Sequence, residues 1–400
     1  MKYLFYLEPY TFIFIGNKRV LVYNTINSAY IEVDYQNHLL KKIIDTLNKP
    51  DNGYGIVLDE VEIIDEGIAG FIQVVKNSFS GDLVLFKQGM LKPFIFKPAP
   101  YMNNLVEDED DADYSKTAGE FALQNLSEVT LFLSSDDINQ NGGAYHLQMN
   151  HPYLCGKDCH LKVTDYAPIL HQLKTAGVAR VNVTGTYQLL EFDRVYKETG
   201  IKLYYYTALC DSCVEICKTN IPAEVFIHPE EFSVKTVCLI NEHNREGLVW
   251  NFIIKSLKDI EIIDKLNLPK HINYKYTPFY DGSNLPFFKQ YVFNSLDDII
   301  AKPVSRKAIF RRQLLNENFF GRLWIDAAGQ VYGNMNFAPV GNIRNVNLKD
   351  MVAKLIVEKQ SPWLLKRDVE PCKHCVNRYL CPSISNYELA MNRYNLCHVI

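Results

Sequence analysis

Short apolar segments separated by turns fill the first ninety residues. Residues 3–7, 11–15, 20–23 and 30–33 alternate between apolar and polar positions or run apolar, which predicts four strands. Apolar residues then recur at helical spacing over 39–47, and a second helix is expected over about 68–75. This order of strands and helices predicts a small winged-helix-like α+β domain over residues 1–90.

Residues 91–118 have the composition of a linker. Pro93, Pro98 and Pro100 interrupt regular structure, and six of the seven residues from 107 to 113 are acidic. Because like charges repel and keep a segment extended and solvated, this stretch is predicted to be an acidic, proline-containing linker.

Strand and helix patterns alternate from about residue 119 to 320. Buried strands are expected at 129–132, 181–183, 203–206, 234–240 and 274–278, with a helix over 166–173. Repeated β–α units predict an α/β fold with a parallel sheet, as a partial or complete β/α barrel. Residues 321–400 then read as a separate unit, with a hairpin around Ala327-Ala328-Gly329, a helix over 348–358 and a cysteine-rich tail.

Charge and composition exclude some classes of partner. The chain of 400 residues has 42 Lys and Arg against 46 Asp and Glu, a net charge of −4, which gives no support to nucleic-acid binding. The apolar stretch over 3–15 is too short to span a membrane and lacks the features of a signal peptide. We therefore expect a cytoplasmic protein without a membrane partner, in which clustered cysteines are metal ligands rather than disulfides.

The tail holds four of the ten cysteines in a pattern typical of a metal centre. Cys372 and Cys375 form a CxxC pair, Cys381 follows six residues later, and Cys397 comes from a returning segment. Four thiolates suit either Zn²⁺ or a [4Fe–4S] cluster. A zinc ribbon usually has two CxxC pairs. The single pair here favours one [4Fe–4S] cluster, with zinc as the alternative.

Two further groups of cysteines precede the tail. Cys155 and Cys159 are followed by Lys162, where a third cysteine would complete a three-thiolate loop. A protonated lysine offers no lone pair to iron, so this loop is interpreted as two surface cysteines.

The second group is spaced to share one helical face, and buried apolar cysteines are the preferred interpretation over a metal or redox role. Its members are Cys210, Cys213 and Cys217. Cys238 lies in the expected strand over 234–240 and is predicted to belong to the core.

The tail resembles the SPASM domain of radical S-adenosylmethionine peptide-modifying enzymes. The hairpin near Asp326, the Gly341-Asn342-Ile343 step and the spacing of the tail cysteines match that pattern. The resemblance implies that Cys372, Cys375, Cys381 and Cys397 bind the second of two auxiliary clusters. The cysteines of the first are missing, since Val346 and Ser385 occupy two of their places. One cluster is therefore implied.

The middle region resembles a radical S-adenosylmethionine barrel whose cofactor motifs have decayed. Cys155 and Cys159 match two cluster ligands, Lys162 stands in the third place, and only Gly185 remains of the motif that holds the methionine amine. An alternative alignment places the ancestral loop at 134–139, where there is no cysteine. Either alignment implies no S-adenosylmethionine and no catalytic residue.

The N-terminal unit resembles the PqqD-like leader-recognition module in the order of its elements. Such modules pair a strand edge with a leader peptide. Most of the chain resembles the pseudo-radical-SAM family of GG-Bacteroidales peptide maturation, and as a second choice the SPASM-domain maturases of grasp-with-spasm systems. The resemblance implies a degenerate partner protein that binds a ribosomal precursor peptide, an active radical SAM maturase, or both.

Two alternatives remain open at this stage. The chain is an enzyme if Cys155, Cys159 and one of Cys210, Cys213 or Cys217 form a rebuilt metal site at the barrel mouth, where active sites of β/α barrels lie. It is a zinc-stabilised adaptor if the four tail cysteines bind zinc instead of iron.

Overall fold

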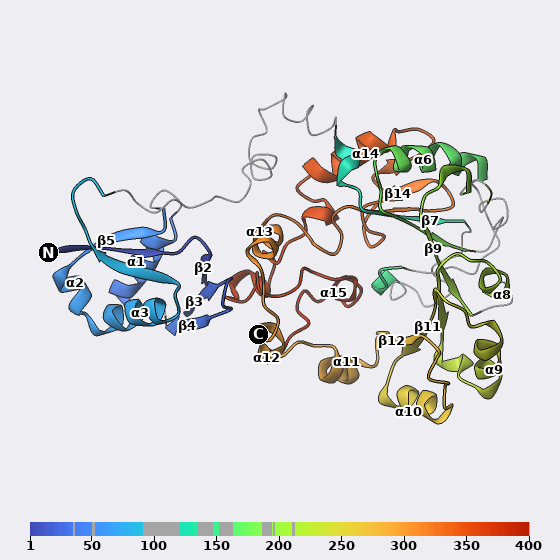
Figure 1. Ribbon diagram of the computed structural model, residues 1–400, viewed down its shortest axis with the longest axis horizontal. Helices are drawn as coiled ribbons and strands as arrows, with labels where there is room; N and C mark the ends of the chain where they lie inside the picture. The colour runs from blue at the N-terminus through green and yellow to red at the C-terminus, as the bar shows by residue number, and fades with distance from the viewer. Residues whose placement is uncertain are drawn as a thin grey trace.

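The computed structural model places most of the chain in two sheet-containing regions (Figure 1). The structure describes residues 1–34, 37–49, 53–90, 121–133, 147–151, 163–185, 194, 197–209 and 213–399. The predicted linker over 91–118 therefore lies outside the described residues. No helix in the described ranges is long and apolar enough to cross a membrane.

The N-terminal region contains two three-stranded antiparallel sheets. One has the order β5-β1-β6, from β1 (Lys2–Leu7), β5 (Gly55–Asp59) and β6 (Gly81–Leu85). The other has the order β2-β3-β4, from β2 (Thr11–Ile15), β3 (Arg19–Asn24) and β4 (Tyr30–Asp34). Three helices accompany them: α1 (His38–Leu47), α2 (Glu60–Ile64) and α3 (Glu66–Asn77). The four predicted strands and both predicted helices are present, whereas β5, β6 and α2 were not predicted.

Helix α1 shows why the apolar spacing was informative. The Asn37 side chain caps its first turn by accepting hydrogen bonds from Leu39 N and Leu40 N. The buried residues of α1 recur at intervals of three and four, as one face of a helix requires, and are Leu40, Ile43, Ile44 and Leu47. They pack against the inner faces of both N-terminal sheets.

The rest of the chain is built on a nine-stranded sheet with the order β12-β11-β10-β9-β8-β7-β13-β14-β15. The strands from β12 to β13 in this order pair in parallel, and β14 and β15 extend the sheet with antiparallel pairs. The strands are β7 (Glu128–Phe132), β8 (Arg180–Thr184), β9 (Leu203–Ala208), β10 (Ala223–Ile227), β11 (Leu248–Ile254), β12 (Tyr274–Pro278), β13 (Arg322–Ile325), β14 (Gln330–Tyr332) and β15 (Gly341–Asn342). The predicted mixed α/β fold with a large parallel sheet is confirmed.

Helices follow most of these strands. They are α6 (Val163–Thr175), α8 (Cys213–Cys217), α9 (Val234–His243), α10 (Leu257–Lys265), α11 (Leu285–Tyr291), α12 (Leu296–Ile300), α13 (Arg306–Leu314), α14 (Leu348–Val357) and α15 (Asn386–Ala390). Short 3-10 turns occur at Ala122–Asn125, Pro229–Glu231, Pro362–Leu364 and Cys372–His374. The predicted hairpin corresponds to β13 and β14, so the sheet continues past residue 321, where a separate unit was expected to begin.

The two faces of the large sheet differ in chemistry. Alternate residues such as Val129, Val181 and Val225 pack with α6, α8, α9 and α14 in the largest apolar core. Figure 1 shows α6, α8, α9 and α10 along this side of the sheet. The residues between them point to the opposite face, because side chains alternate along a strand. We call that side the polar face, defined by Glu128, Asn182, Tyr206, Glu224 and Asn251.

The prediction of a buried strand over 234–240 is wrong. These residues form α9, whose first turn is capped by Ser233, and Cys238 is exposed rather than part of the core. Strands β10 and β11 were missed instead. Each carries a polar residue on the polar face, Glu224 or Asn251, which interrupts the apolar pattern.

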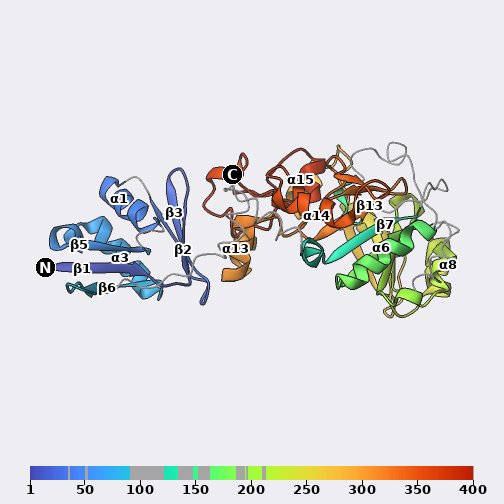
Figure 2. The same cartoon turned by 90° about the horizontal axis from the view of Figure 1, so that it is seen from above.

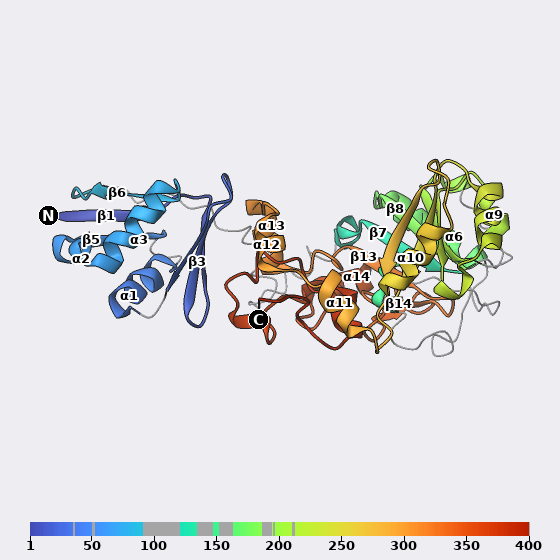
Figure 3. The ribbon, with the colours of Figure 1, turned by 90° about the horizontal axis from the view of Figure 1, so that it is seen from below.

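The β2-β3-β4 sheet joins the two regions because both of its faces are buried. Ile13, Val20 and Val22 point toward α1 and α3. On the opposite face, Phe14, Leu21 and Tyr23 belong to another apolar core, which we call the junction core. Residues from distant parts of the chain complete it: Ile299, Val304, Ile309, Val376 and Leu380. Figures 2 and 3 show β3 between the N-terminal helices and the segments that carry α12 and α13.

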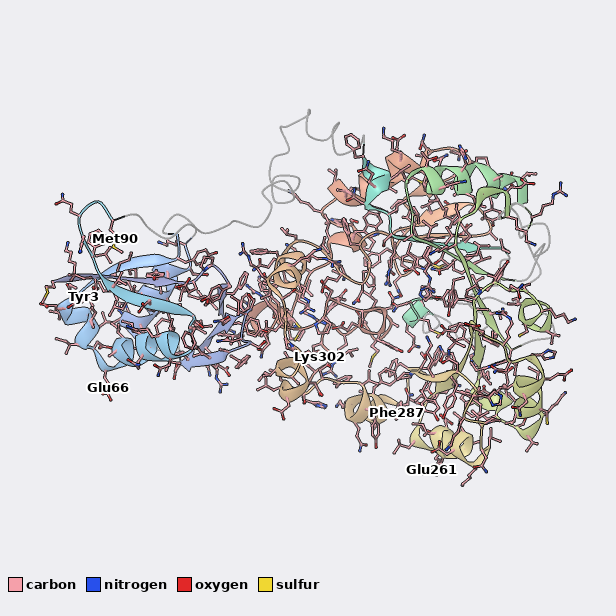
Figure 4. All side chains as sticks on the ribbon, viewed as in Figure 1. Tyr3, Glu66, Met90, Glu261, Phe287 and Lys302 are labelled. Atoms are coloured by element: carbon pink, nitrogen blue, oxygen red, sulfur yellow. The ribbon has the colours of Figure 1, made fainter. Side chains whose placement is uncertain are left out.

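Ring contacts and hydrogen bonds add direction to this junction. Phe12 meets Phe310 at a centroid distance of 5.3 Å, and Phe14 meets Tyr379 at 5.5 Å. The Tyr23 hydroxyl accepts a hydrogen bond of 2.9 Å from the backbone N–H of Val304. Side chains from both sides meet here, near the labelled Lys302 (Figure 4). The N-terminal unit is therefore packed onto the C-terminal segments rather than joined only by the chain.

Replacing Leu21 by alanine tests the junction. Leu21 is fully buried, and deleting such a side chain costs about 2–5 kcal/mol. We expect Leu21→Ala to lower the free energy of unfolding, measured by chemical denaturation, by a corresponding amount. The matched control Leu39→Ala removes a leucine that is 45% exposed, so its effect should stay within about 0.5 kcal/mol. Equal effects of the two substitutions would contradict the shared core.

Candidate metal centre

The cysteine segment begins where a buried tryptophan fixes the chain to the large sheet. Trp363 is fully buried, and its indole N–H donates a hydrogen bond of 3.0 Å to the backbone oxygen of Arg322, the first residue of β13. From there the chain reaches the 3-10 turn that contains Cys372. The N–H of Cys375 donates to the carbonyl of Cys372 at 2.9 Å, which closes the CxxC turn.

Two further backbone arrangements bring in the remaining cysteines. The N–H of Cys381 donates to the carbonyl of Asn377 at 2.9 Å, so a second turn follows the first directly. Cys397 pairs with Asn294 in an isolated bridge, fixed by the N–H of Asn294 donating to Leu396 O at 2.9 Å and that of His398 donating to Asn294 O at 3.0 Å. These bonds hold Cys397 beside Asn294.

All four tail cysteines line one small cavity. Cys372, Cys375, Cys381 and Cys397 face it together with Arg367 and Asn377. Within the part of the chain that the structure describes, no group of three or more His, Cys, Asp or Glu side chains is arranged to hold a single metal ion. The donor set around the cavity nevertheless fits the chemistry of a four-cysteine centre, for which Zn²⁺ and [4Fe–4S] are the two candidates.

Burial favours the protonated form of three of these thiols, although the positive charge of Arg367 lies nearby. Burial raises the pKa of Cys381 to about 12, and it also raises the pKa of Cys372 and Cys375. The thiolate, not the thiol, binds metals. A metal that binds here would therefore displace protons from the cysteines, and its positive charge would compensate for the burial of their negative charge.

Arg367 is the charged neighbour of the cysteine cavity. Its guanidinium donates to Cys372 Sγ at 3.6 Å and to Tyr394 O at 3.1 Å. Glu388 holds it in place through two hydrogen bonds of 2.9 and 3.3 Å, and the side chains of this pair are 10% and 2% exposed. Such outer partners orient the ligands of a metal centre, and the sequence motif gave no signal for this pair.

The sequence-predicted barrel positions fall largely outside the described residues. This applies to Cys155, Cys159, Lys162 and Cys210, to the alternative loop at 134–139, and to the side chain of Cys213. Gly185 is described: it is buried, follows β8 directly and has a φ of +91°, a conformation that favours glycine. Cys217 is buried in the large core, as predicted.

A short segment covers the polar face of the sheet. Met149 packs against Tyr206, Phe226 and Ile253, and the His151 ring stacks on Tyr206 with centroids 4.2 Å apart. Figure 1 shows this teal segment, 147–151, between α15 and the sheet. Residues 147–151 therefore cover part of the polar face of the sheet.

Three distant residues hold this segment in place. Gln148 exchanges two hydrogen bonds with the backbone of Tyr280, at 2.9 and 2.6 Å. Asn386 Nδ2 donates to Met149 O at 3.3 Å, and Asn336 Nδ2 donates to Leu147 O at 3.2 Å. Asn386 belongs to α15, which follows the cysteine turns in the chain, so the C-terminal segment also fixes the covering of the polar face.

Charged side chains extend along the polar face, from buried Glu224 to Lys275, which is 51% exposed. Glu128 lies 3.3 Å from Arg322 and 3.5 Å from His151. Glu224 accepts hydrogen bonds of 2.9 Å from Lys275 and 2.5 Å from Asn251. Sequence analysis missed these groups. The recurrence of polar residues at alternate positions of otherwise apolar strands was the signal that could have revealed them.

His151 is the group on this face that burial affects most. Burial, followed by the positive charge of Arg180, lowers the pKa of His151 to about 3, so the ring is neutral near pH 7. Its Nδ1 atom is buried and has no hydrogen-bond partner among the described residues. A neutral histidine stacked on Tyr206 is consistent with a covered, water-poor surface.

Comparison with known proteins gives a limited result. No protein-family model matches the chain, and no curated protein matches it. Among solved structures, Streptococcus suis SuiB bound to precursor peptide SuiA aligns with a TM-score of 0.42 and 13% identity over 94% of each chain. Streptococcus suis SuiB alone aligns with a TM-score of 0.40 and 12% identity over 89% of each chain. Likeness at this level does not assign a function.

Removing the guanidinium beside the cysteines should be costly. Arg367→Met would leave Glu388 buried without its counter-charge, and breaking a buried pair in this way costs about 3–5 kcal/mol. We expect a corresponding loss of stability in chemical denaturation. Arg311→Met is the matched control, because Arg311 is 48% exposed and Glu317 keeps its contact of 2.7 Å with Arg312. A neutral effect of Arg367→Met would contradict the buried pair.

Proposed function

We propose that this chain is a non-catalytic partner protein in the maturation of a ribosomally made peptide. It binds the precursor peptide through its N-terminal unit and carries one [4Fe–4S] cluster on Cys372, Cys375, Cys381 and Cys397. An active radical SAM maturase is the expected second partner. The observation that carries this proposal is the shared core in which the β2-β3-β4 sheet packs directly on the segment that bears the four cysteines.

The open edge of β4 supports peptide binding. Asn24 N donates to Ala29 O at 3.0 Å, beside the β3–β4 ladder. Because the pattern alternates in antiparallel pairs, the N–H groups of Ile31 and Val33 point to β3 and those of Tyr30 and Glu32 point away. Within the described residues, β4 has β3 as its partner strand and another edge that no strand covers. An extended peptide can add to such an edge.

The covered polar face supports the non-catalytic assignment. Met149 and His151 pack where a barrel enzyme would keep room for its cofactor and substrate. Lys162 and Gly185 stand in the two degenerate motifs of the sequence. Both observations favour a scaffold over an S-adenosylmethionine enzyme.

The four-cysteine site gives the C-terminal segment a structural role. A bound [4Fe–4S] cluster would link the CxxC turn, the turn at Cys381 and the returning segment at Cys397. This segment is made of short turns, and Val376 and Leu380 are the residues it contributes to the junction core. Small regions with thin cores are commonly stabilised by such links. Zn²⁺ on the same thiols would supply the same link.

Substituting one residue of β4 tests the peptide-binding edge. Glu32→Pro removes the outward N–H while its fixed φ remains compatible with an edge strand. Because a hydrogen bond contributes about 1 kcal/mol net, we expect peptide affinity to fall about fivefold. The probes are fluorescently labelled synthetic peptides from short reading frames next to the gene, measured by anisotropy.

Glu32→Gln is the matched control for this experiment. It removes the charge that pairs with Arg19 at 3.0 Å but keeps the backbone N–H. We expect Glu32→Gln to bind peptide nearly as well as the unaltered chain. If both variants bind equally, the peptide does not pair with β4. If no such peptide binds the unaltered chain, the proposed function is wrong.

The non-catalytic assignment has its own test. Anaerobically reconstituted full-length protein is mixed with S-adenosylmethionine and a strong reductant, and cleavage products are measured by chromatography. We expect no 5′-deoxyadenosine above the level without protein, because the degenerate motifs and the covered polar face leave no cofactor site. A known radical SAM enzyme serves as positive control. Repeated turnover would instead favour a rebuilt enzyme site.

A further inference from the structure

A groove separates the open edge of β4 from the CxxC turn. It has a volume of about 790 Å³, within the range of ligand pockets. Arg19, Tyr30 and Glu32 line one wall, and His374 and Cys375 belong to the other. Residues of β4, the strand on which we place the peptide, and Cys375 of the cysteine site therefore line the same groove.

Two consecutive hydrogen bonds connect these sides. The Tyr30 hydroxyl of β4 donates to Asn377 Oδ1 at 3.0 Å, and the backbone N–H of Asn377 donates to Cys375 Sγ at 3.4 Å. Burial is the largest cause of the raised pKa of Tyr30, so this hydroxyl stays protonated and remains a donor near neutral pH. Asn377 therefore connects the Tyr30 side chain of β4 to the sulfur of Cys375.

The turn between β2 and β3 touches the CxxC segment as well. A Cβ atom on Gly16 would lie 2.8 Å from His374 O and 2.8 Å from Val376 Cγ1. These distances leave no room for a side chain at position 16. The turn between β2 and β3 therefore packs directly on residues 374–376.

We propose that filling of the four-cysteine site and ordering of the β4 edge are coupled. A group bound by the cysteines fixes the CxxC turn and with it Val376 and Asn377. These two residues contact Gly16 and Tyr30 of the sheet region. A peptide on β4 then binds an edge that is already ordered. Coupling between sites is reciprocal, so an ordered sheet also slows loss of the bound group. The inference rests on the proposed cluster and adds its regulatory role.

Hydrogen exchange on the full chain tests the forward direction without any peptide. The protein is reconstituted with ferrous iron and sulfide, and one half is then stripped with a chelator. We expect stripping to speed amide exchange several-fold in peptides covering 19–24 and 30–34, with little change in β1 and α3. Unchanged exchange in β3 and β4 after confirmed iron loss would overturn the coupling.

Chelation kinetics test the reverse direction with a matched pair of variants. Tyr30→Phe removes only the hydroxyl that meets Asn377. Tyr10→Phe removes a hydroxyl that donates to Phe79 O at 3.1 Å, at a site outside the groove. We expect visible absorbance to decay about fivefold faster in Tyr30→Phe than in Tyr10→Phe or the unaltered chain. Identical decay in both variants contradicts the proposal.

These outcomes separate the coupling from the proposed function. Failure to bind iron and sulfide would overturn the cluster and the coupling together. Bound iron with identical behaviour of the two tyrosine variants would overturn the coupling alone. Demonstrated coupling in a chain that binds no peptide would leave the coupling standing and reject the peptide-maturation role.

Discussion

Burial of the β2-β3-β4 sheet on both faces is the constraint on which the organisation of this protein depends. A small α+β unit usually keeps one sheet face for solvent. Here Val20 and Val22 belong to the N-terminal core, whereas Leu21 and Tyr23 belong to the junction core. Exposing the second face would return several large apolar side chains to water, at about 25 cal/mol per Å². The N-terminal unit is therefore held in place, and its open edge has a fixed position relative to the cysteines.

The C-terminal segment performs several structural tasks at once. Its residues Val376 and Leu380 pack against the β2-β3-β4 sheet, and its four cysteines line one cavity. Asn386 in the same segment hydrogen-bonds to residues 147–151 on the polar face. The buried pair of Arg367 and Glu388 lies between these features, because Glu388 is in α15 and Arg367 touches Cys372. A group bound at the cysteines would thus act on a segment that contacts both other regions.

Local patterns in the sequence predicted the local elements. The spacing of Leu40, Ile43 and Ile44 predicted α1, and Ala327-Ala328-Gly329 predicted the turn between β13 and β14. Patterns failed where tertiary contacts decide the outcome. Glu224 and Asn251 interrupt β10 and β11, yet the two side chains hydrogen-bond to each other across the polar face. The apolar run over 234–240 was consistent with a strand, and the Ser233 cap was the overlooked sign of a helix.

The candidate site was likewise predictable only in its local part. Spacing alone indicated the four tail cysteines, which line one cavity, because a CxxC turn is a local structure. It gave no sign of Arg367 with Glu388, of Tyr30 on Asn377, or of the segment at Met149. The partners in these contacts are between 21 and 347 residues apart in the chain, so only the fold brings them together.

Iron and acid-labile sulfide analysis of the anaerobically purified full chain tests the central claim most directly. The account predicts about four irons and four sulfides per chain, as one four-thiolate [4Fe–4S] site requires. It also predicts their loss in Cys381→Ala and retention in Cys238→Ala, whose thiol is exposed in α9. Stoichiometric zinc without sulfide, or full iron content in Cys381→Ala, would contradict it.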